Sequence, residues 1–336
     1  MQYTIWLTYA CNLKCTYCYE EKEKRNLYLS KEKARQLLTY IKDRSDTYSD
    51  NNISIVLHGG EPLLNYEVLC YIVENVKSWD NNVTISMTTN GTLINENNIE
   101  FILENIDDLS ISLDGIAQVH NANRKYKDGK GSFVDAVKNV NKILERKGNT
   151  IARMTVTHKT VGNLYDNVIF LHELGFKFIS PIINQYDAGW NEENMAVLEK
   201  QLLQLSDFCS HQAEHLYIGM LEKAKYRKKS RCCPGTTLNI DAQGDIYPCV
   251  YVVGDVKFKM GNIIDGIDEA KLSDINYINN KELEQCKTCF WKDYCHGYRC
   301  KLFNFAISGK YEPGYAACRL EHALLKTYRQ CAVCTE

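Results

Sequence analysis

The first half of the chain alternates short apolar runs with longer amphipathic segments. The runs have the length of buried strands, and the segments between them carry apolar residues every three or four positions, as helices do. We expect strands at residues 4–8, 53–57, 83–88, 109–113, 151–157 and 176–183. We expect helices at residues 31–44, 66–78, 96–104, 133–147 and 164–174. Repeated strand–helix units predict an α/β fold with a parallel sheet, a partial (β/α)6 barrel of the TIM type.

The second half follows a different pattern. Residues 194–225 form one long amphipathic stretch whose leucines, Leu198, Leu202 and Leu205, recur at helical spacing and are most simply core residues. Residues 237–247 read as a hairpin of two short strands around a turn. We therefore expect three parts: a barrel at 1–190, a helical bridge at 191–230 and a cysteine-rich domain at 231–336.

Charge and composition exclude some classes of partner. The formal net charge of −2 gives no electrostatic reason to expect nucleic acid or an anionic membrane. No run of 18 apolar residues and no signal peptide are visible, so we expect a cytoplasmic protein. Fifteen cysteines in such a chain indicate metal or redox chemistry rather than disulfides. Ten of them fall between Cys232 and Cys334.

Three further cysteines form a CxxxCxxC motif directly after the first expected strand. Cys11, Cys15 and Cys18 can bind three irons of a 4Fe–4S cluster, which leaves the fourth iron free for another ligand. Zinc fits this spacing poorly because no second pair of ligands lies nearby. Other polar motifs follow the next three strands: His-Gly-Gly-Glu-Pro at 58–62, Thr-Asn-Gly at 89–91 and Ser-Leu-Asp-Gly at 112–115. The carboxyl ends of parallel strands meet at one mouth, so these motifs should lie together.

Together these motifs resemble the radical S-adenosylmethionine (SAM) superfamily. The resemblance implies that SAM binds the free iron and is cleaved to a 5′-deoxyadenosyl radical, which abstracts a hydrogen atom from the substrate. It also implies a set of SAM contacts: Tyr17, Gly60, Glu61, Asn90, Ser112, Arg124 and Gln185. Glycine at position 60 permits close approach of a ligand, and the Glu61 carboxylate suits an ammonium group. By the same likeness, Ser112 and Arg124 contact the SAM carboxylate.

The C-terminal cysteines resemble the SPASM extension of that superfamily. Its Gly-x4-Cys element matches residues 244–249 and its Cx2Cx5C element matches residues 286–295. The resemblance implies two auxiliary 4Fe–4S clusters, hence three clusters in all. One cluster would be bound by Cys286, Cys289, Cys295 and Cys318. The other would be bound by Cys233 (or the adjacent Cys232), Cys249 and Cys300.

Two features of this region leave alternatives open. Four residues separate Cys295 from Cys300, where the family usually has three, so the loop there is expected to bulge. Zinc is the other reading of a Cx2C pair with a third cysteine nearby. The final pair, Cys331 and Cys334, is not required by the extension and has no assigned role.

The overall likeness is to anaerobic sulfatase maturases and to maturases of ribosomally made peptides. In the sulfatase maturases an Asp follows the Gly-x4-Cys cysteine as proton acceptor, whereas this chain has Val250, which cannot accept a proton. We therefore expect an enzyme that installs a crosslink, thioether, epimerisation or oxidation in a peptide. The alternatives are formylglycine formation in a sulfatase and a noncatalytic zinc or electron-transfer module. No catalytic base is assigned.

The expected partners follow from that function. They are a peptide or protein substrate and a reductant such as flavodoxin or ferredoxin. Because the chain begins almost at the first strand, leader recognition is expected to need the barrel itself or a separate protein. No nucleic-acid or membrane partner is expected.

Overall fold

One sheet of eleven strands organises the molecule. The structure, a computed structural model, describes residues 1–20, 26–48, 51–212, 215–225 and 234–333. The strand order is β11-β10-β9-β8-β1-β2-β3-β4-β5-β6-β7. The strands are β1 (Gln2–Trp6), β2 (Asn52–His58), β3 (Asn82–Thr89), β4 (Asp108–Ser112), β5 (Ile151–Val156), β6 (Phe178–Ile183), β7 (Tyr217–Ile218), β8 (Thr237–Ile240), β9 (Asp245–Tyr247), β10 (Gly261–Asn262) and β11 (Gly266–Ile267).

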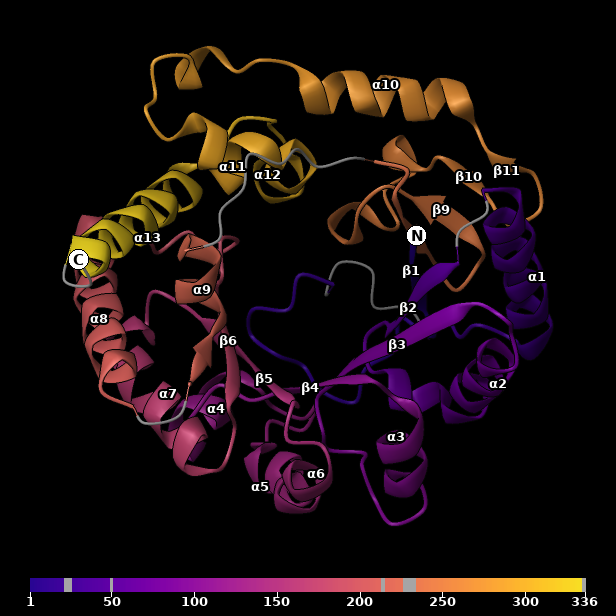
Figure 1. Cartoon of the computed structure of the whole chain (residues 1–336), viewed down its shortest axis with the longest axis horizontal. Coiled ribbons are helices and arrows are strands. Elements are labelled where there is room, and N and C mark those ends of the chain that lie inside the picture. The colour runs from indigo at the N-terminus through magenta and orange to yellow at the C-terminus, as the bar shows by residue number, and fades with distance from the viewer. Residues whose placement is uncertain (21–25, 49–50, 213–214, 226–233, 334–336) are drawn as a thin grey trace.

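Helices of the first two thirds of the chain cover the outer side of this curved sheet (Figure 1). The α-helices are α1 (Lys31–Thr47), α2 (Tyr66–Lys77), α3 (Ile99–Asn105), α4 (Ala117–Asn123), α5 (Phe133–Val137), α6 (Val140–Arg146), α7 (Leu164–Glu173), α8 (Glu192–Ser210), α9 (Gly219–Lys225), α10 (Glu269–Asn280), α11 (His296–Arg299), α12 (Lys301–Ser308) and α13 (Tyr315–Val333). Helices α10, α11 and α12 lie across the open side of the sheet (Figure 1). Short 3-10 turns include η2 (Pro62–Asn65), η3 (Val161–Asn163) and η4 (Val250–Val252). None of the helices in the described ranges is long and apolar enough to span a bilayer.

Strands β1 to β6 are parallel and adjacent in chain order, which confirms the predicted partial (β/α)6 barrel. Their apolar side chains alternate along the strand. In β2, Ile53, Ile55 and Leu57 are buried in the core, while the residues between them are only partly buried. This period of two places one set of side chains under the helices and the other on the inner face.

Several element boundaries differ from the sequence predictions. β1 lies at Gln2–Trp6 rather than at residues 4–8, because it is the earlier residues that pair with β2. The helix expected at residues 133–147 is interrupted at Asn139, whose side-chain amide donates to the Ile94 carbonyl oxygen at 2.8 Å. Helix α3 begins at Ile99, after a turn in which the Asn98 side chain accepts a hydrogen bond from the Asn95 N–H.

The sheet is wider than the six predicted strands. β7 pairs in parallel with β6, and β8 pairs in parallel with β1. The stretch at residues 194–225, expected to be helical, therefore contains α8, strand β7 and α9. β8 and β9 are antiparallel and confirm the predicted hairpin.

The C-terminal segment closes the ring opposite β4 (Figure 1). Its last helix, α13, packs on α8, where Arg319 pairs with Glu192 at 2.8 Å and Lys326 pairs with Glu199 at 2.6 Å. The predicted core leucines of α8, Leu198, Leu202 and Leu205, are all buried. Residues 251–256 and 305–307 of this segment line a cleft that Cys18 of the N-terminal cysteine loop also lines.

Candidate functional site

The three cysteines of the N-terminal motif lie on one irregular loop after β1. Leu13 in this loop is buried, whereas Cys11, Cys15 and Cys18 are partly exposed and form no disulfide. Backbone hydrogen bonds hold the loop against the end of α4, from Lys14 N to Lys125 O (2.7 Å) and from Thr16 N to Asn123 O (3.0 Å). Because Leu13 is buried and hydrogen bonds hold the backbone, the partly exposed thiols are the part of the loop that a ligand can reach.

The glycine pair after β2 touches the backbone that leads into this loop. The Gly60 N–H donates to the Thr8 carbonyl oxygen at 3.0 Å. A β-carbon at Gly60 would lie 2.4 Å from the Ala10 carbonyl oxygen. At Gly59, where φ is +135°, a β-carbon would lie 2.3 Å from the Thr8 oxygen. Only glycine fits this contact, so the pair positions the cysteine loop as well as leaving space for a ligand.

Glu61 is buried and ties the end of β2 to the end of β3. Its carboxylate accepts hydrogen bonds from the Asn90 N–H (2.8 Å), the Thr89 hydroxyl (2.7 Å) and the Leu63 N–H (3.2 Å). Burial raises the pKa of Glu61 to about 7, although these three hydrogen bonds lower it. A carboxylate offers about four acceptor positions, so one remains for a further donor.

Asn90 and Ser112 lie on neighbouring parts of the same mouth. The Asn90 amide donates to the Asn12 side chain at 2.9 Å and lies 3.9 Å from the Cys11 sulfur. Ser112 ends β4, next to Arg153 on β5, and is partly buried. Asn90 is thus brought to the cysteine loop directly, and Ser112 lies on the adjoining barrel wall.

Asp114 connects two of the predicted SAM contacts. It is fully buried and accepts a hydrogen bond from the Tyr17 hydroxyl at 2.5 Å. Arg124 pairs with the same carboxylate at 3.1 Å, and its guanidinium lies 5.3 Å from the centre of the Tyr17 ring. The backbone N–H of Thr155 also donates to Asp114, at 3.0 Å. The sequence predicted Tyr17 and Arg124 but did not assign Asp114, which holds both.

A cleft with a volume of about 1330 Å³ opens beside this group. Tyr17, Cys18 and Tyr19 line this cleft, and so do residues 251–256 of the cysteine-rich segment. The loops after β5 and β6 complete it. The cleft therefore joins the N-terminal cysteine loop to the C-terminal third of the chain.

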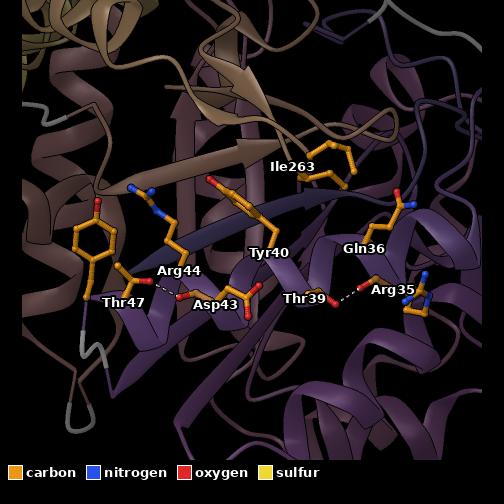
Figure 2. Close-up of a pocket in the computed structure, with 10 residues that line it drawn as sticks. Arg35, Gln36, Thr39, Tyr40, Asp43, Arg44, Thr47 and Ile263 are labelled. Carbon is orange, nitrogen blue, oxygen red and sulfur yellow. Dashed lines mark hydrogen bonds between the residues drawn. The ribbon is translucent and has the colours of Figure 1, made fainter.

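Two other cavities lie elsewhere. Gln185, the last predicted SAM contact, lines a cavity of about 200 Å³ between the loop after β6 and α12–α13, and is not among the residues that line the large cleft. A groove of about 500 Å³ runs along α1 and is lined by Tyr40, Arg44 and Ile263 among other residues. Figure 2 shows these side chains. None of the predicted site residues lines this groove.

Comparison with known proteins identifies the family. The family model of the radical SAM superfamily matches residues 6–166. A protein of Methanocaldococcus jannaschii without an assigned function is 32% identical over 265 residues, covering 77% of this chain and 87% of that protein. The chain belongs to the radical SAM superfamily. It is therefore an enzyme, and the alternative of a noncatalytic module is not supported.

Other relatives have assigned functions. The cysteine-type anaerobic sulfatase-maturating enzyme of Clostridium perfringens (strain 13 / Type A) is 27% identical over 317 residues, covering 86% of this chain and 85% of the enzyme. The subtilosin biosynthesis protein AlbA of Bacillus subtilis (strain 168) is 24% identical over 272 residues, covering 77% of this chain and 56% of AlbA. The solved structure of native anSMEcpe with bound AdoMet and Cp18Cys peptide has a TM-score of 0.82 at 23% identity, covering 99% of this chain and 98% of that one. These findings confirm the predicted SPASM-type resemblance and the fold.

Membership of the radical SAM superfamily implies a 4Fe–4S cluster and SAM, and residues of the cysteine loop and of the adjoining strand ends fit both, although only Tyr17 and Cys18 among them line the cleft itself. Three partly exposed thiols share one loop, and Cys18 lines the cleft. The buried Nε of Arg124 has no hydrogen-bond partner, so the guanidinium retains a donor for a carboxylate even while it pairs with Asp114. Within the described ranges, no three His, Cys, Asp or Glu side chains converge as they would around a single metal ion.

Four C-terminal cysteines surround a second cavity. Cys286, Cys289, Cys295 and Cys318 line a space of about 450 Å³. Burial raises the pKa of the Cys286 thiol to about 11, and the other three thiols add to the rise. Electrostatic repulsion of this kind acts between groups on one side of the molecule, which agrees with the shared cavity. The fold thus gathers the four cysteines that the sequence grouped together.

Cys249 and Cys300 meet at a different place, beside an aromatic cluster. Burial raises the pKa of Tyr251 to about 12, with further contributions from both thiols. Burial and the same two thiols also raise the pKa of Tyr186. The two cysteines therefore share neighbours, as expected of ligands to one group. Cys232, Cys233 and Cys334 lie outside the described residues, and Cys331 belongs to α13.

Sequence reasoning missed several residues at the centre of the site. Tyr19, Tyr186, Tyr251 and Phe303 form a cluster with ring centroids 4.3 to 6.4 Å apart. Arg153 points to the same region, since its charge lowers the pKa of Tyr251. The available signal was a charged residue in the middle of an apolar strand, which is unusual unless that residue has a role on the inner face.

Proposed function

We propose that this chain is a radical SAM maturase that modifies a residue of a peptide or protein substrate. The observation that carries the proposal is the large cleft, whose walls come from the N-terminal cysteine loop and from the cysteine-rich segment. A cleft of about 1330 Å³ exceeds the usual volume for a small molecule, and thus suits an extended peptide beside SAM. AlbA, a relative, acts in bacteriocin biosynthesis by its name, and the structural neighbour anSMEcpe binds a peptide.

Five of the predicted residues have a proposed role in holding the cluster at the N-terminal loop and SAM. Cys11, Cys15 and Cys18 would bind three irons of the cluster. Glu61 would accept from the SAM ammonium, and Arg124 would bind the carboxylate. When bound, the cluster and SAM supply a 5′-deoxyadenosyl radical that removes a hydrogen atom from the substrate.

The surrounding residues fix the positions of these groups. Asp114 holds the Arg124 guanidinium and the Tyr17 hydroxyl in one arrangement, and burial disfavours any other place for the paired charges. The aromatic cluster at Tyr19 and Tyr251 limits the access of water to the inner end of the cleft. Exclusion of water protects a reactive radical from side reactions.

The number of clusters, the domain limits and the partners are further parts of the proposal. We assign one auxiliary cluster to Cys286, Cys289, Cys295 and Cys318. We assign the other to Cys249, Cys300 and Cys233, with Cys232 as the alternative to Cys233. The barrel, the bridge and the SPASM domain are placed at residues 1–190, 191–230 and 231–336. A flavodoxin or ferredoxin would supply electrons, and either the barrel itself or a separate protein would recognise a leader peptide.

Formylglycine formation in a sulfatase is the second candidate. Similarity to a sulfatase maturase over 86% of the chain favours it. Val250, which is partly buried in η4, offers no proton acceptor at the position of the family's Asp. The cleft contains another base, because His158 Nδ1 lies 2.7 Å from both oxygens of Asp187. A carboxylate at Nδ1 favours the tautomer in which Nε2 accepts a proton.

Anaerobic reconstitution tests the main proposal. The protein should bind about 12 iron atoms, as three clusters require, and should form 5′-deoxyadenosine from SAM when reduced. Replacement of Cys11, Cys15 and Cys18 by Ala should remove about four irons and abolish that product. A triple variant that still forms 5′-deoxyadenosine would contradict the assignment.

Mass measurement separates the two candidate functions. A peptide that carries the sulfatase motif should lose mass on conversion of Cys or Ser to formylglycine if the second candidate is right. His158→Gln should then lower the yield of modified peptide and leave 5′-deoxyadenosine formation intact. An unchanged sulfatase peptide, together with modification of a short peptide encoded beside the gene, would favour the first candidate.

A further inference from the structure

β5 carries one cationic residue on the inner face of the barrel. Ala152, Met154 and Val156 alternate with it and are buried in the core, so Arg153 projects to the opposite face. Its neighbours at the same level are Ser112 on β4 and Ser180 on β6. Serine side chains cannot neutralise a guanidinium.

Arg153 forms no ion pair with an acidic side chain of the described residues. Its Nε is buried from solvent and has no hydrogen-bond partner. Burial lowers the pKa of Arg153, and the phenols of Tyr251 and Tyr19, rather than a carboxylate, oppose that shift. Arg124, by contrast, is paired with Asp114 at 3.1 Å. Arg153 as a whole is partly buried, and a partly buried charge without an acidic partner is costly unless a ligand supplies the counter-charge.

The residues around Arg153 come from both ends of the chain. Tyr19 follows the last cysteine of the N-terminal loop, and its hydroxyl lies 3.4 Å from His58 Nε2. Burial, with the added charge of Arg153, lowers the pKa of His58 to about 4. Tyr251 lies in η4, two residues after Cys249, and packs on Phe303 with ring centroids 4.3 Å apart. Arg153 therefore faces the space between the two cysteine-rich parts.

We propose that Arg153 binds a carboxylate inside the barrel, and that this carboxylate belongs to the residue presented for modification. The inference rests on the proposed function and deepens it: the substrate would be a peptide with an Asp or Glu side chain, or a C-terminal carboxylate, at the reaction site. A guanidinium binds a carboxylate through two parallel hydrogen bonds, and this geometry selects against amides.

The α-carboxylate of SAM is the other source of the same chemistry. Ser112 is one of the predicted SAM contacts and lies beside Arg153, which suits binding of the SAM carboxylate. Tyr251, on the cysteine-rich segment, interacts with Arg153 as well, and this position favours a carboxylate of the substrate. The two sources predict different losses in an Arg153 variant, so binding of SAM and binding of peptide have to be measured separately.

The test uses reconstituted holoenzyme and a library of capped pentapeptides with three randomised positions, made with C-terminal acids and with C-terminal amides. Peptides retained by immobilised enzyme are identified by mass spectrometry, and SAM affinity is measured by equilibrium dialysis. The variants are Arg153→Gln and Arg153→Lys. Arg146→Gln is the matched control, because Arg146 is an exposed guanidinium on α6 that pairs with Glu100 outside the barrel.

Wild type and Arg146→Gln should enrich acidic peptides about tenfold over their amide counterparts, as expected for one charge-assisted pair. Arg153→Gln should abolish that preference and keep SAM affinity within about twofold. Arg153→Lys keeps the charge and loses the planar fork, so it should retain part of the preference even if the Gln variant folds poorly.

The other outcomes are equally decisive. A roughly tenfold loss of SAM affinity in Arg153→Gln, with peptide preference unchanged, would assign the carboxylate to SAM. Unchanged SAM affinity and unchanged peptide preference would overturn the proposal. If wild type retains peptides but shows no preference for acidic ones, binding of a peptide carboxylate is rejected and the peptide-maturase function is not. Wild type that cleaves SAM but retains no peptide would instead reject the peptide-maturase function.

Discussion

A methyl group at Gly60 should detach the cysteine loop from the barrel. The β-carbon of Gly60→Ala would lie 2.4 Å from the Ala10 carbonyl oxygen and 2.8 Å from the Tyr9 carbonyl oxygen. Ordinary C···O contacts are about 3.3 Å or longer, so one of the two segments has to move by about 1 Å. Both obstacles are backbone atoms, and no side-chain rotation relieves the collision.

We expect this displacement to move the cysteine loop rather than the strands of the sheet. Overpacking of this kind usually costs about 1–3 kcal/mol. The hydrogen bonds from Gly60 N to Thr8 O and from Glu61 N to Ala10 O, both 3.0 Å long, are the bonds that the shift would lengthen. They join the end of β2 to the residue immediately before Cys11. We therefore expect Cys11 to lose its place relative to Cys15 and Cys18, and cluster binding to fail.

The assay combines iron content with SAM cleavage. Gly60→Ala, purified without oxygen and reconstituted, should contain about four iron atoms fewer than wild type and form little 5′-deoxyadenosine. Its unfolding midpoint should drop only modestly, since the core side chains are unchanged. Gly162→Ala is the matched control, because a β-carbon there has no neighbour within 4 Å. A Gly60→Ala enzyme with full iron content and wild-type 5′-deoxyadenosine formation would refute the steric argument.

Three further predictions follow from buried charges and thiols. Asp114→Asn leaves the Arg124 guanidinium buried without its counter-charge and should lower the free energy of unfolding by about 3–5 kcal/mol, measured with urea. Because burial raises the pKa of Glu61 to about 7, its stabilising contribution is complete below about pH 4.5 and is lost as the pH rises through about 7. In ligand-free protein, Glu61→Gln should therefore remove about 3 kcal/mol of the decline in stability between pH 5 and pH 8; an unchanged decline would contradict the assignment. Cys318→Ala should lower the iron content by about four atoms, whereas Cys209→Ala, in α8 outside both cysteine sets, should leave it unchanged.

Much of the fold could be predicted from local patterns of apolar residues in the sequence. Apolar alternation within β2 and helical spacing in α8 were visible in the sequence because each depends on residues a few positions apart. Strand β7, and the pairing of the predicted β8 with β1, were missed for the opposite reason. β7 has only two residues and is a strand because it pairs with β6, and β8 joins the barrel sheet because it pairs with β1. The partner of β8 is β1, at the other end of the chain, and no local pattern reports such a pairing.

The functional site likewise has residues that the sequence predicts and residues that only the structure reveals. The spacing of Cys11, Cys15 and Cys18 is a property of the sequence, and so is the grouping of the C-terminal cysteines. Tyr17 and Arg124 could be proposed from motifs, but Asp114, which holds them, could not. A hydrogen-bond partner is defined by distance in space, and Asp114 is nearly a hundred positions from Tyr17 in the chain.

The sequence alone determined that this chain carries a cysteine loop for a cluster and a second cysteine-rich region, because ligand type and spacing are written in adjacent residues. Only the tertiary structure decided which polar groups are satisfied and which are not. Arg124 and Arg153 both lie on the barrel, yet Arg124 is paired with Asp114, whereas Arg153 on the inner face of β5 has no acidic partner among the described residues. The difference is set by burial and by which strands lie side by side, and these are properties of the folded chain.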